Sequence, residues 1–142
     1  MPKVTEPEQR AYEELQVYTL SLGDPGFLHQ ILVDTWALRH AGEETRPMAV
    51  AFALASLYLH FERGFTGRAA QRVHMHLARR DREWPRFVLP EDRGRTTASQ
   101  VLAAPAGEER NRAIEAWAAE LWAAYRDSHQ PIAELLEQLG IG

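Results

Sequence analysis

The sequence contains no cysteine, and this absence excludes several kinds of chemistry at once. Disulfides, thiolate metal sites, iron–sulfur clusters and a cysteine nucleophile are all ruled out, so a metal ion would have to be bound by histidine and carboxylate side chains. The chain has six histidines among its 142 residues. Their positions therefore decide which metal or acid–base chemistry the chain can support.

Long apolar runs and the common catalytic motifs are also missing. No stretch approaches the roughly 18 apolar residues that a membrane span needs, and the polar start MPKVTEPEQRAYEELQ does not resemble a signal peptide. There is no glycine-rich phosphate loop, no GxSxG elbow and no Ser/His/Asp spacing typical of a hydrolase. These absences predict a soluble cytoplasmic protein without a membrane partner.

The pattern that is present is helical. No segment alternates apolar and polar residues as a strand would, and the turns are short, which predicts an all-α fold in one domain over residues 1–142. We expect an antiparallel helical bundle of five to six helices, with a flexible start at residues 1–6 and a long irregular link at about residues 85–106. The helices are predicted at about residues 7–22, 25–41, 47–63, 67–84, 108–128 and 131–140, with one short helix after Thr97.

Two local features refine this scheme. Asp24 is expected to cap the second helix, with Pro25 at its first position, so that DPG marks a helix start and not a turn. In the link, REWPRFVLP is predicted to anchor on the core through its apolar residues, held extended by Pro85 and Pro90. These residues are Trp84, Phe87 and Leu89.

The segment PMAVAFALASLYLHF has no charged residue across fifteen positions, which predicts a helix at the centre of the bundle. One of its faces is small, formed by Ala49, Ala53 and Ser56 and closed by His60. Small residues there either let another helix approach closely or leave room for a ligand. A buried His60 must hydrogen-bond in either case, because an unpaired buried polar group costs about 1–3 kcal/mol.

If neighbouring helices alternate in direction, His29, His60 and His74 lie at one end of the bundle, with His129 as a further partner. Such a layer would suit a divalent zinc, nickel, manganese or iron ion. No local signature supports it, because the HxE at residues 60–62 and the HxH at residues 74–76 point apart on a helix. Separately bonded structural histidines, or a catalytic histidine without metal, are the open alternatives.

The turn ERGFTGRAAQR is a second predicted site. Its helix start presents free backbone N–H groups, and nearby arginines supply charge for a phosphate or carboxylate. The anion-binding residues would be Arg63, Thr66, Gly67, Arg68 and Arg72. The alternative is that Thr66 satisfies the amides itself.

Charge is segregated along the chain. Residues 1–46 carry eight acids against four bases, whereas residues 60–95 carry nine arginines against five acids. Such blocks mark complementary surfaces folded onto each other, a solvated helix side, or an anion-binding face. Few aromatic residues interleave the arginines as stacking platforms, so a nucleic-acid partner is not favoured.

Four stretches of the chain resemble one bacterial family of small all-helical proteins whose function is unassigned. The stretches are LQVYTLSLGDPGFLHQ, LYLHFERGFTGRAAQRVHMHLARR, WPRFVLPEDRG and VLAAPAGEERNRAIEAW, and the likeness runs from about Tyr12 to the C-terminus. The resemblance implies a bacterial origin and a helical fold, but no activity. Its members often have a histidine where this chain has Glu13 and another where it has Ile31, and some carry an N-terminal cysteine pair; this chain has none of these. If relatives bind a metal through those positions, Glu13 could still serve here as a carboxylate ligand.

Two classes of function remain open, and whether the protein is an enzyme is open with them. In the first, a histidine-lined metal or small-molecule pocket at one end of the bundle supports a hydrolase or transferase reaction. In the second, the chain is a non-enzymatic helical interaction module or a homodimer, and its histidines are structural.

Overall fold

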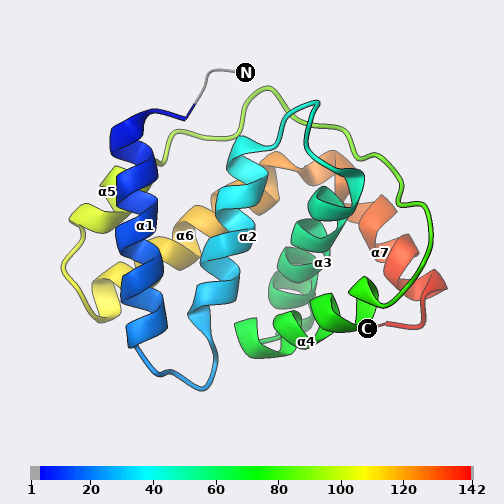
Figure 1. Ribbon diagram of the computed structural model, residues 1–142, viewed down its shortest axis with the longest axis horizontal. Coiled ribbons are helices and arrows are strands. Elements are labelled where there is room, and N and C mark those ends of the chain that lie inside the picture. The colour runs from blue at the N-terminus through cyan, green and yellow to red at the C-terminus, as the bar shows by residue number, and fades with distance from the viewer. Residues whose placement is uncertain (1–3, 142) are drawn as a thin grey trace.

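The computed structural model describes residues 4–141, and every regular element in that range is helical (Figure 1). The elements are α1 (Glu6–Ser21), α2 (Leu28–His40), α3 (Pro47–Arg63), α4 (Gly67–Ala78), α5 (Ala98–Ala103), α6 (Glu108–Ala124), the 3-10 turn η1 (Arg126–Ser128) and α7 (His129–Gln138). The predicted all-α class is confirmed. Among these helices none combines the length and apolarity that crossing a bilayer requires. Part of the flexible start predicted at residues 1–6, namely residues 1–3, lies outside the described residues.

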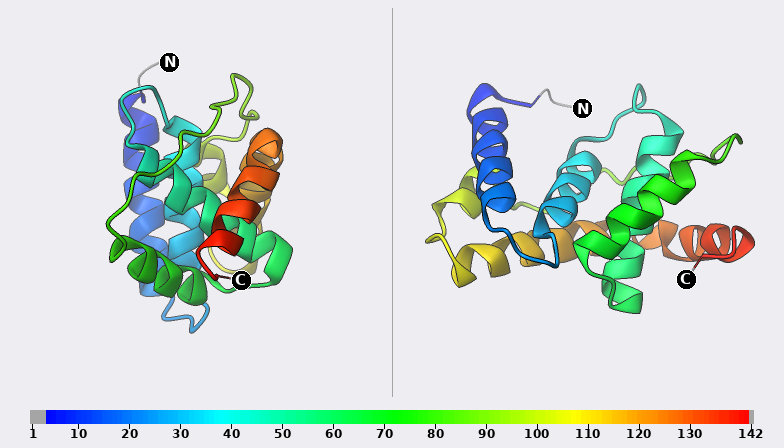
Figure 2. Two further views of the ribbon diagram at one scale, coloured as in Figure 1. Left: turned by 90° about the vertical axis from the view of Figure 1, so that its right-hand side faces the viewer. Right: turned by 60° about the horizontal axis from the view of Figure 1, so that its bottom comes forward.

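The first three helices stand side by side and alternate in direction, but the later helices do not extend this arrangement (Figure 1). α6 crosses behind them, α4 lies across one end of α3, and α7 packs on the far side of α3 (Figures 1 and 2). The core lies where these layers meet. Its fully buried side chains include Leu32 of α2, Leu54 and Leu57 of α3, and Trp117 and Leu121 of α6.

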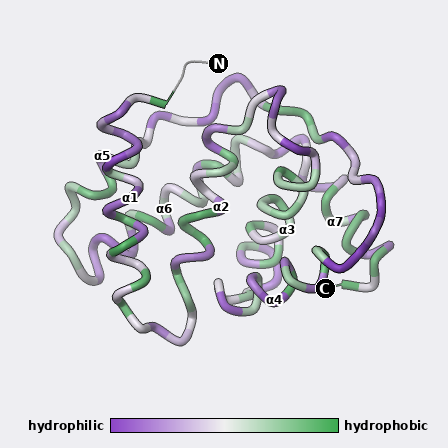
Figure 3. Tube along the Cα trace, viewed as in Figure 1, coloured by the Kyte–Doolittle hydropathy of each residue, from purple (hydrophilic) through white to green (hydrophobic). Residues whose placement is uncertain are grey.

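α3 occupies the centre of the molecule and has the bounds that its sequence predicts. Pro47 lies in its first turn, and Gly64 ends it with φ 71°, a left-handed conformation that glycine adopts without steric cost. The Leu59 carbonyl accepts the N–H groups of both Gly64 and Phe65. Residues 50–57 and Leu59 are all buried, in agreement with the hydrophobic colour of this helix in Figure 3.

The start of α2 differs from the prediction. The helix begins at Leu28, and Pro25 and Gly26 form a turn before it, so the expected helix start at Pro25 is wrong. The Gly26 carbonyl accepts a hydrogen bond from the Arg68 amide at 2.8 Å, and Phe27 adopts a left-handed φ of 57°. This contact with α4 holds the segment as a turn, and Asp24 instead accepts the Leu28 amide at 3.1 Å.

The end of α4 also differs. The helix stops at Ala78, before the predicted end at Trp84, and the irregular link therefore starts earlier than expected. Trp84 leaves the helix axis to pack edge-on against Phe52 of α3, with ring centroids 5.1 Å apart. The predicted anchoring is confirmed, since Trp84, Phe87 and Leu89 are partly buried against the core.

The region predicted as two helices at 108–128 and 131–140 is divided differently. α6 ends at Ala124, because the buried Tyr125 turns inward and donates its hydroxyl to the Leu38 carbonyl at 2.6 Å. The 3-10 turn η1 follows, and α7 begins at His129 instead of Pro131.

A buried arginine fastens the link to the C-terminal end of α2. Arg93 is 5% exposed, and its guanidinium donates to the carbonyls of Leu38 at 3.0 Å and Ala41 at 2.7 Å. These carbonyls belong to the last turn of a helix, which lacks internal donors and carries partial negative charge. Arg93 therefore caps α2 from a segment far along the chain.

Candidate functional site

The histidines predicted to form a metal layer each have their own hydrogen-bonding partner. His60, near the end of α3, contacts the Phe65 carbonyl through Nδ1 at 2.7 Å and Glu115 of α6 through Nε2 at 2.7 Å. The Glu115 carboxylate raises the pKa of His60. Both ring nitrogens are thus engaged, and His60 connects α3 to α6.

His74 belongs to a buried polar cluster between α2, α3 and α4. Its Nε2 lies 2.6 Å from Ser56 Oγ and 3.6 Å from Asp34 Oδ1, and Gln30 donates to the other Asp34 oxygen at 3.1 Å. Burial raises the pKa of Asp34 to about 7 and lowers the pKa of His74. Serine and aspartate face the same ring nitrogen, so this cluster lacks the relay geometry of a Ser–His–Asp triad, in which they face opposite nitrogens.

The other two predicted histidine ligands lie against different elements. His29 of α2 makes a 2.9 Å hydrogen bond between its Nδ1 and Thr19 Oγ1 of α1. His129, at the start of α7, contacts the Trp122 carbonyl through Nε2 at 2.7 Å and stacks on the indole with ring centroids 3.6 Å apart. Glu13 is exposed on α1.

These placements bear directly on the predicted metal layer. Within residues 4–141 no three histidine or acidic side chains gather in a way that could hold a metal ion. The topology predicted that these histidines lie at the same end of the bundle. Their imidazoles nevertheless do not converge, because each ring is directed at its own backbone or side-chain partner. A metal ion at this layer stays a prediction.

The turn predicted to bind an anion is packed against the chain itself. Thr66 Oγ1 accepts the Ala69 amide at 3.1 Å, and the Gly26 carbonyl takes the Arg68 amide. A Cβ on Gly67 would collide with the Phe27 carbonyl oxygen, which shows how closely the turn approaches. The Arg68 guanidinium lies over the Phe27 ring, 4.1 Å from its centroid. An anion would have to displace these contacts, and its binding stays a prediction.

The two remaining arginines of that turn point elsewhere. Arg63 is exposed and donates to the Tyr58 hydroxyl at 3.3 Å, while Arg72 is exposed on the outer side of α4. The structure therefore does not bring the predicted anion ligands to one centre.

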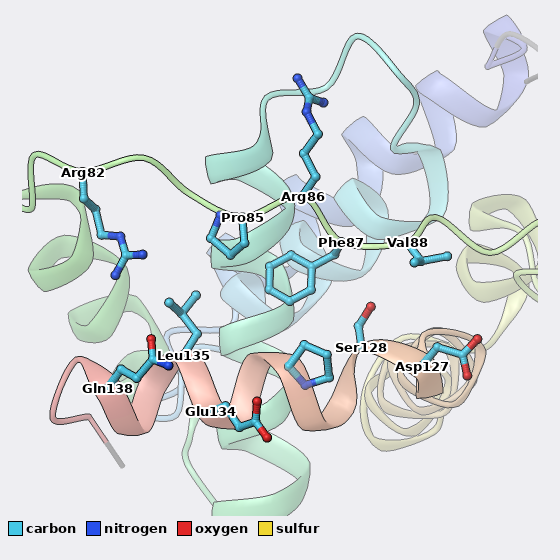
Figure 4. Close-up of a pocket in the computed structure, with 11 residues that line it drawn as sticks. Arg82, Pro85, Arg86, Phe87, Val88, Asp127, Ser128, Glu134, Leu135 and Gln138 are labelled. Carbon is cyan, nitrogen blue, oxygen red and sulfur yellow. The ribbon is translucent and has the colours of Figure 1, made fainter.

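A groove that the sequence did not predict runs between the link and α7 (Figure 4). It encloses about 330 Å³. Phe87 points from the link toward α7, and Leu135 points back toward the link, so the middle is apolar. Arg82 lies at one end and Asp127 at the other. The lining residues are Arg82, Pro85, Arg86, Phe87, Val88, Asp127, Ser128, Pro131, Glu134, Leu135 and Gln138.

The link, residues 79–97, runs between two pockets, the groove beside α7 and a second pocket. Arg86 and Phe87 also line this second pocket of about 340 Å³ beside the start of α3. In the described part of the chain, residues 81–96 make no backbone–backbone hydrogen bond, so the peptide groups of this extended segment are not paired with another strand or loop. The two prolines and the alternating apolar residues of REWPRFVLP predicted that this segment is anchored on the core. They did not predict the groove that lies beside it.

The comparisons with known proteins identify a relationship without an activity. The sequence model of a family described as "Family of unknown function (DUF5946)" matches residues 8–126. No curated protein matches the chain. No solved structure matches it either.

Proposed function

From the premise that this chain belongs to the family of unknown function DUF5946, we propose that it is a helical interaction module which binds an extended peptide segment in the groove between the link and α7. The observation that carries the proposal is the groove itself, which is apolar in the middle and lies beside residues 84–88, whose backbone groups make no hydrogen bond with the described residues.

The histidines support a binding role over a catalytic one. His29, His60, His74 and His129 each connect neighbouring elements through short hydrogen bonds, which is what structural histidines do. None of them lines the groove. The groove offers shape, backbone hydrogen bonds and charge, and these are the features by which extended peptides are recognised.

The lining of the groove defines the chemistry of the partner. Phe87 and Leu135 form an apolar centre that suits one bulky apolar side chain. Arg82 at one end favours a carboxylate, and Asp127 at the other end favours a cation. The partner segment therefore carries an apolar residue between an acidic and a basic one, and its backbone runs along residues 84–88.

A displayed library of random peptides, selected on the full chain, tests this proposal. Enriched peptides should share the acidic–apolar–basic order and bind in a saturable manner. Val88→Asp places a charge on the exposed rim of the groove and should weaken binding about tenfold or more. Arg82→Glu should change the selected acidic residue to a basic one.

Val4→Asp is the control, because Val4 is also an exposed valine and does not line the groove. This control should bind the selected peptides as the wild type does. Peptides that bind equally well to the wild type and to the Val88→Asp protein, or the absence of any enriched pattern, would refute the proposal.

A further inference from the structure

The acidic and basic blocks of this chain are not joined by arginine–carboxylate ion pairs within the described residues. Within residues 4–141 the one arginine–carboxylate ion pair is Arg10–Glu6, at 3.2 Å, and both partners belong to α1. No arginine of the block at 60–95 lies within ion-pair distance of a described acid. The two blocks contact each other through backbone carbonyls that accept from Arg68 and Arg93, but within the described residues no arginine of the basic block pairs with a carboxylate of the acidic block.

The acidic block presents an exposed face on α1. Glu13, Glu14, Val17 and Leu20 recur at the helical spacing that puts them on one side of α1, and all four are exposed. Val17 is 68% exposed and Leu20 is 58% exposed, so two of the largest exposed apolar side chains lie beside two unpaired carboxylates. We call these four residues the α1 face.

The basic block presents a corresponding face on α4. Arg72, Met75 and Arg79 follow one another at helical spacing, and Arg72 and Arg79 are exposed without an acidic partner among the described residues. Met75 between them is 56% exposed. We call these three residues the α4 face. α2 stands between α1 and α4, so the two faces do not meet within one molecule (Figures 1 and 2).

The two faces are complementary in both charge and apolar character. Each presents two like charges beside exposed apolar side chains, and the charges are opposite in sign. We infer that the α1 face of one molecule docks on the α4 face of a second copy. Carboxylates would then meet guanidinium groups, and Val17 and Leu20 would cover Met75.

A single contact of this kind leaves one free α1 face and one free α4 face in each docked pair. Association then continues head to tail into rings or short filaments, whereas two reciprocal α1–α4 contacts close a two-fold dimer. This surface shares no residue with the peptide groove, so the inference does not depend on the proposed function.

Charge reversal and rescue test the inference by sedimentation velocity over a range of concentrations at low salt. The wild type should exceed its monomer mass of 16.2 kDa as concentration rises, and added salt should reverse this association. Glu13→Arg with Glu14→Arg should weaken association at least about tenfold, and Arg72→Glu with Arg79→Glu should do the same. Mixing these two proteins should restore association, because every α1–α4 contact between them then joins opposite charges.

Two control proteins carry the same changes in charge at other exposed positions. They are Glu43→Arg with Glu83→Arg, and Arg112→Glu with Arg126→Glu, and both should associate as the wild type does. Circular dichroism verifies that all variants are folded. A wild type that stays monomeric, a mixture that is not rescued, or controls that lose association equally would each overturn the inference.

Discussion

Asp34 is the only buried acidic residue in the part of the chain that the structure describes. It is 3% exposed, yet its nearest polar neighbours are Gln30, His74 and Ser56, and none of them is an arginine or lysine. Burial without a cationic partner favours the protonated carboxyl, which is why the pKa of Asp34 rises to about 7. The same burial lowers the pKa of His74, so the cluster favours uncharged forms of both groups.

The raised pKa of Asp34 predicts a specific pH dependence of stability. Between about pH 4 and pH 7 the folded state keeps a proton that the unfolded state releases, so ionisation destabilises the fold as pH rises through this window. Asp34→Asn removes this effect. The free energy of unfolding of the wild type, relative to Asp34→Asn, should therefore fall from pH 4 to pH 8 by on the order of a few kcal/mol.

Urea denaturation at several pH values measures this difference. Asp81→Asn, an exposed aspartate, serves as control and should run parallel to the wild type. Parallel profiles for the wild type and Asp34→Asn would contradict the assignment.

The separately bonded histidines make a second prediction at this scale. Adding zinc, nickel, manganese or iron ions to protein without a histidine tag should leave the melting temperature unchanged, because each imidazole would have to abandon an existing partner to bind a metal. A saturating ligand at 100 times its dissociation constant would stabilise the fold by about 2.7 kcal/mol. A rise in melting temperature that His60→Gln abolishes would instead support the metal layer.

Sequence reasoning placed individual histidines better than it grouped them. It predicted that a buried His60 needs a hydrogen-bonding partner, and that His74 and His76 point apart on their helix; His74 is partly buried and His76 is exposed. It did not find Glu115 as the partner of His60, because that contact spans 55 positions along the chain. Spacing along one helix fixes the direction of a side chain but not the neighbour it meets.

At the scale of the element, the docking of the DPG turn on α4 explains where two helices begin. Gly67 allows this contact, since any Cβ there would collide with the Phe27 carbonyl oxygen. Because this carbonyl belongs to the backbone, it can move away from an added Cβ only if the whole turn shifts.

Gly67→Ala should therefore destabilise the protein by about 1–3 kcal/mol, although alanine is normally the better helix former. Gly42→Ala is the control, because the atoms nearest to a Cβ added at Gly42 belong to the flexible side chain of Glu44, and the φ of Gly42 is not positive. Chemical denaturation compares the two. A Gly67→Ala protein as stable as the wild type would show that the turn is not held by this contact.

The contact between the DPG turn and α4 also shows why some helix ends could not be predicted from the sequence. α3 was predicted to its observed bounds because Pro47 and Gly64 act locally, through their own backbone geometry. The start of α2 and the end of α4 were misplaced because Arg68 and Phe52, which determine them, lie on other helices. The groove could not be foreseen for the same reason, since it exists only where the link passes α7.

At the scale of the whole molecule, the link joins two halves that share one core. Leu54 of α3 and Leu121 of α6 are both fully buried although they lie on opposite sides of the link. The link itself has exposed arginines and no backbone–backbone hydrogen bonds between residues 81 and 96. It is therefore the segment of the described chain most open to a protease.

Limited trypsin digestion should cut first after Arg82 or Arg86. The two fragments, α1–α4 and α5–α7, should then elute together in size-exclusion chromatography, because their buried side chains interlock. Mass spectrometry identifies the cut. First cleavage within α1 or α6, or separation of the fragments without denaturant, would contradict this description of the link.

Arg93 has a consequence for the order in which the protein folds. Its guanidinium donates to carbonyls that lie 52 and 55 positions earlier in the sequence. These last carbonyls of α2 therefore gain their donor only after a loop of more than a third of the chain has closed. Closing a loop of that length costs conformational entropy, and the contacts that offset this cost form only after the loop has closed. We therefore predict that the last turn of α2 forms after the transition state, so that the loss of Arg93 accelerates unfolding far more than it slows folding in stopped-flow measurements.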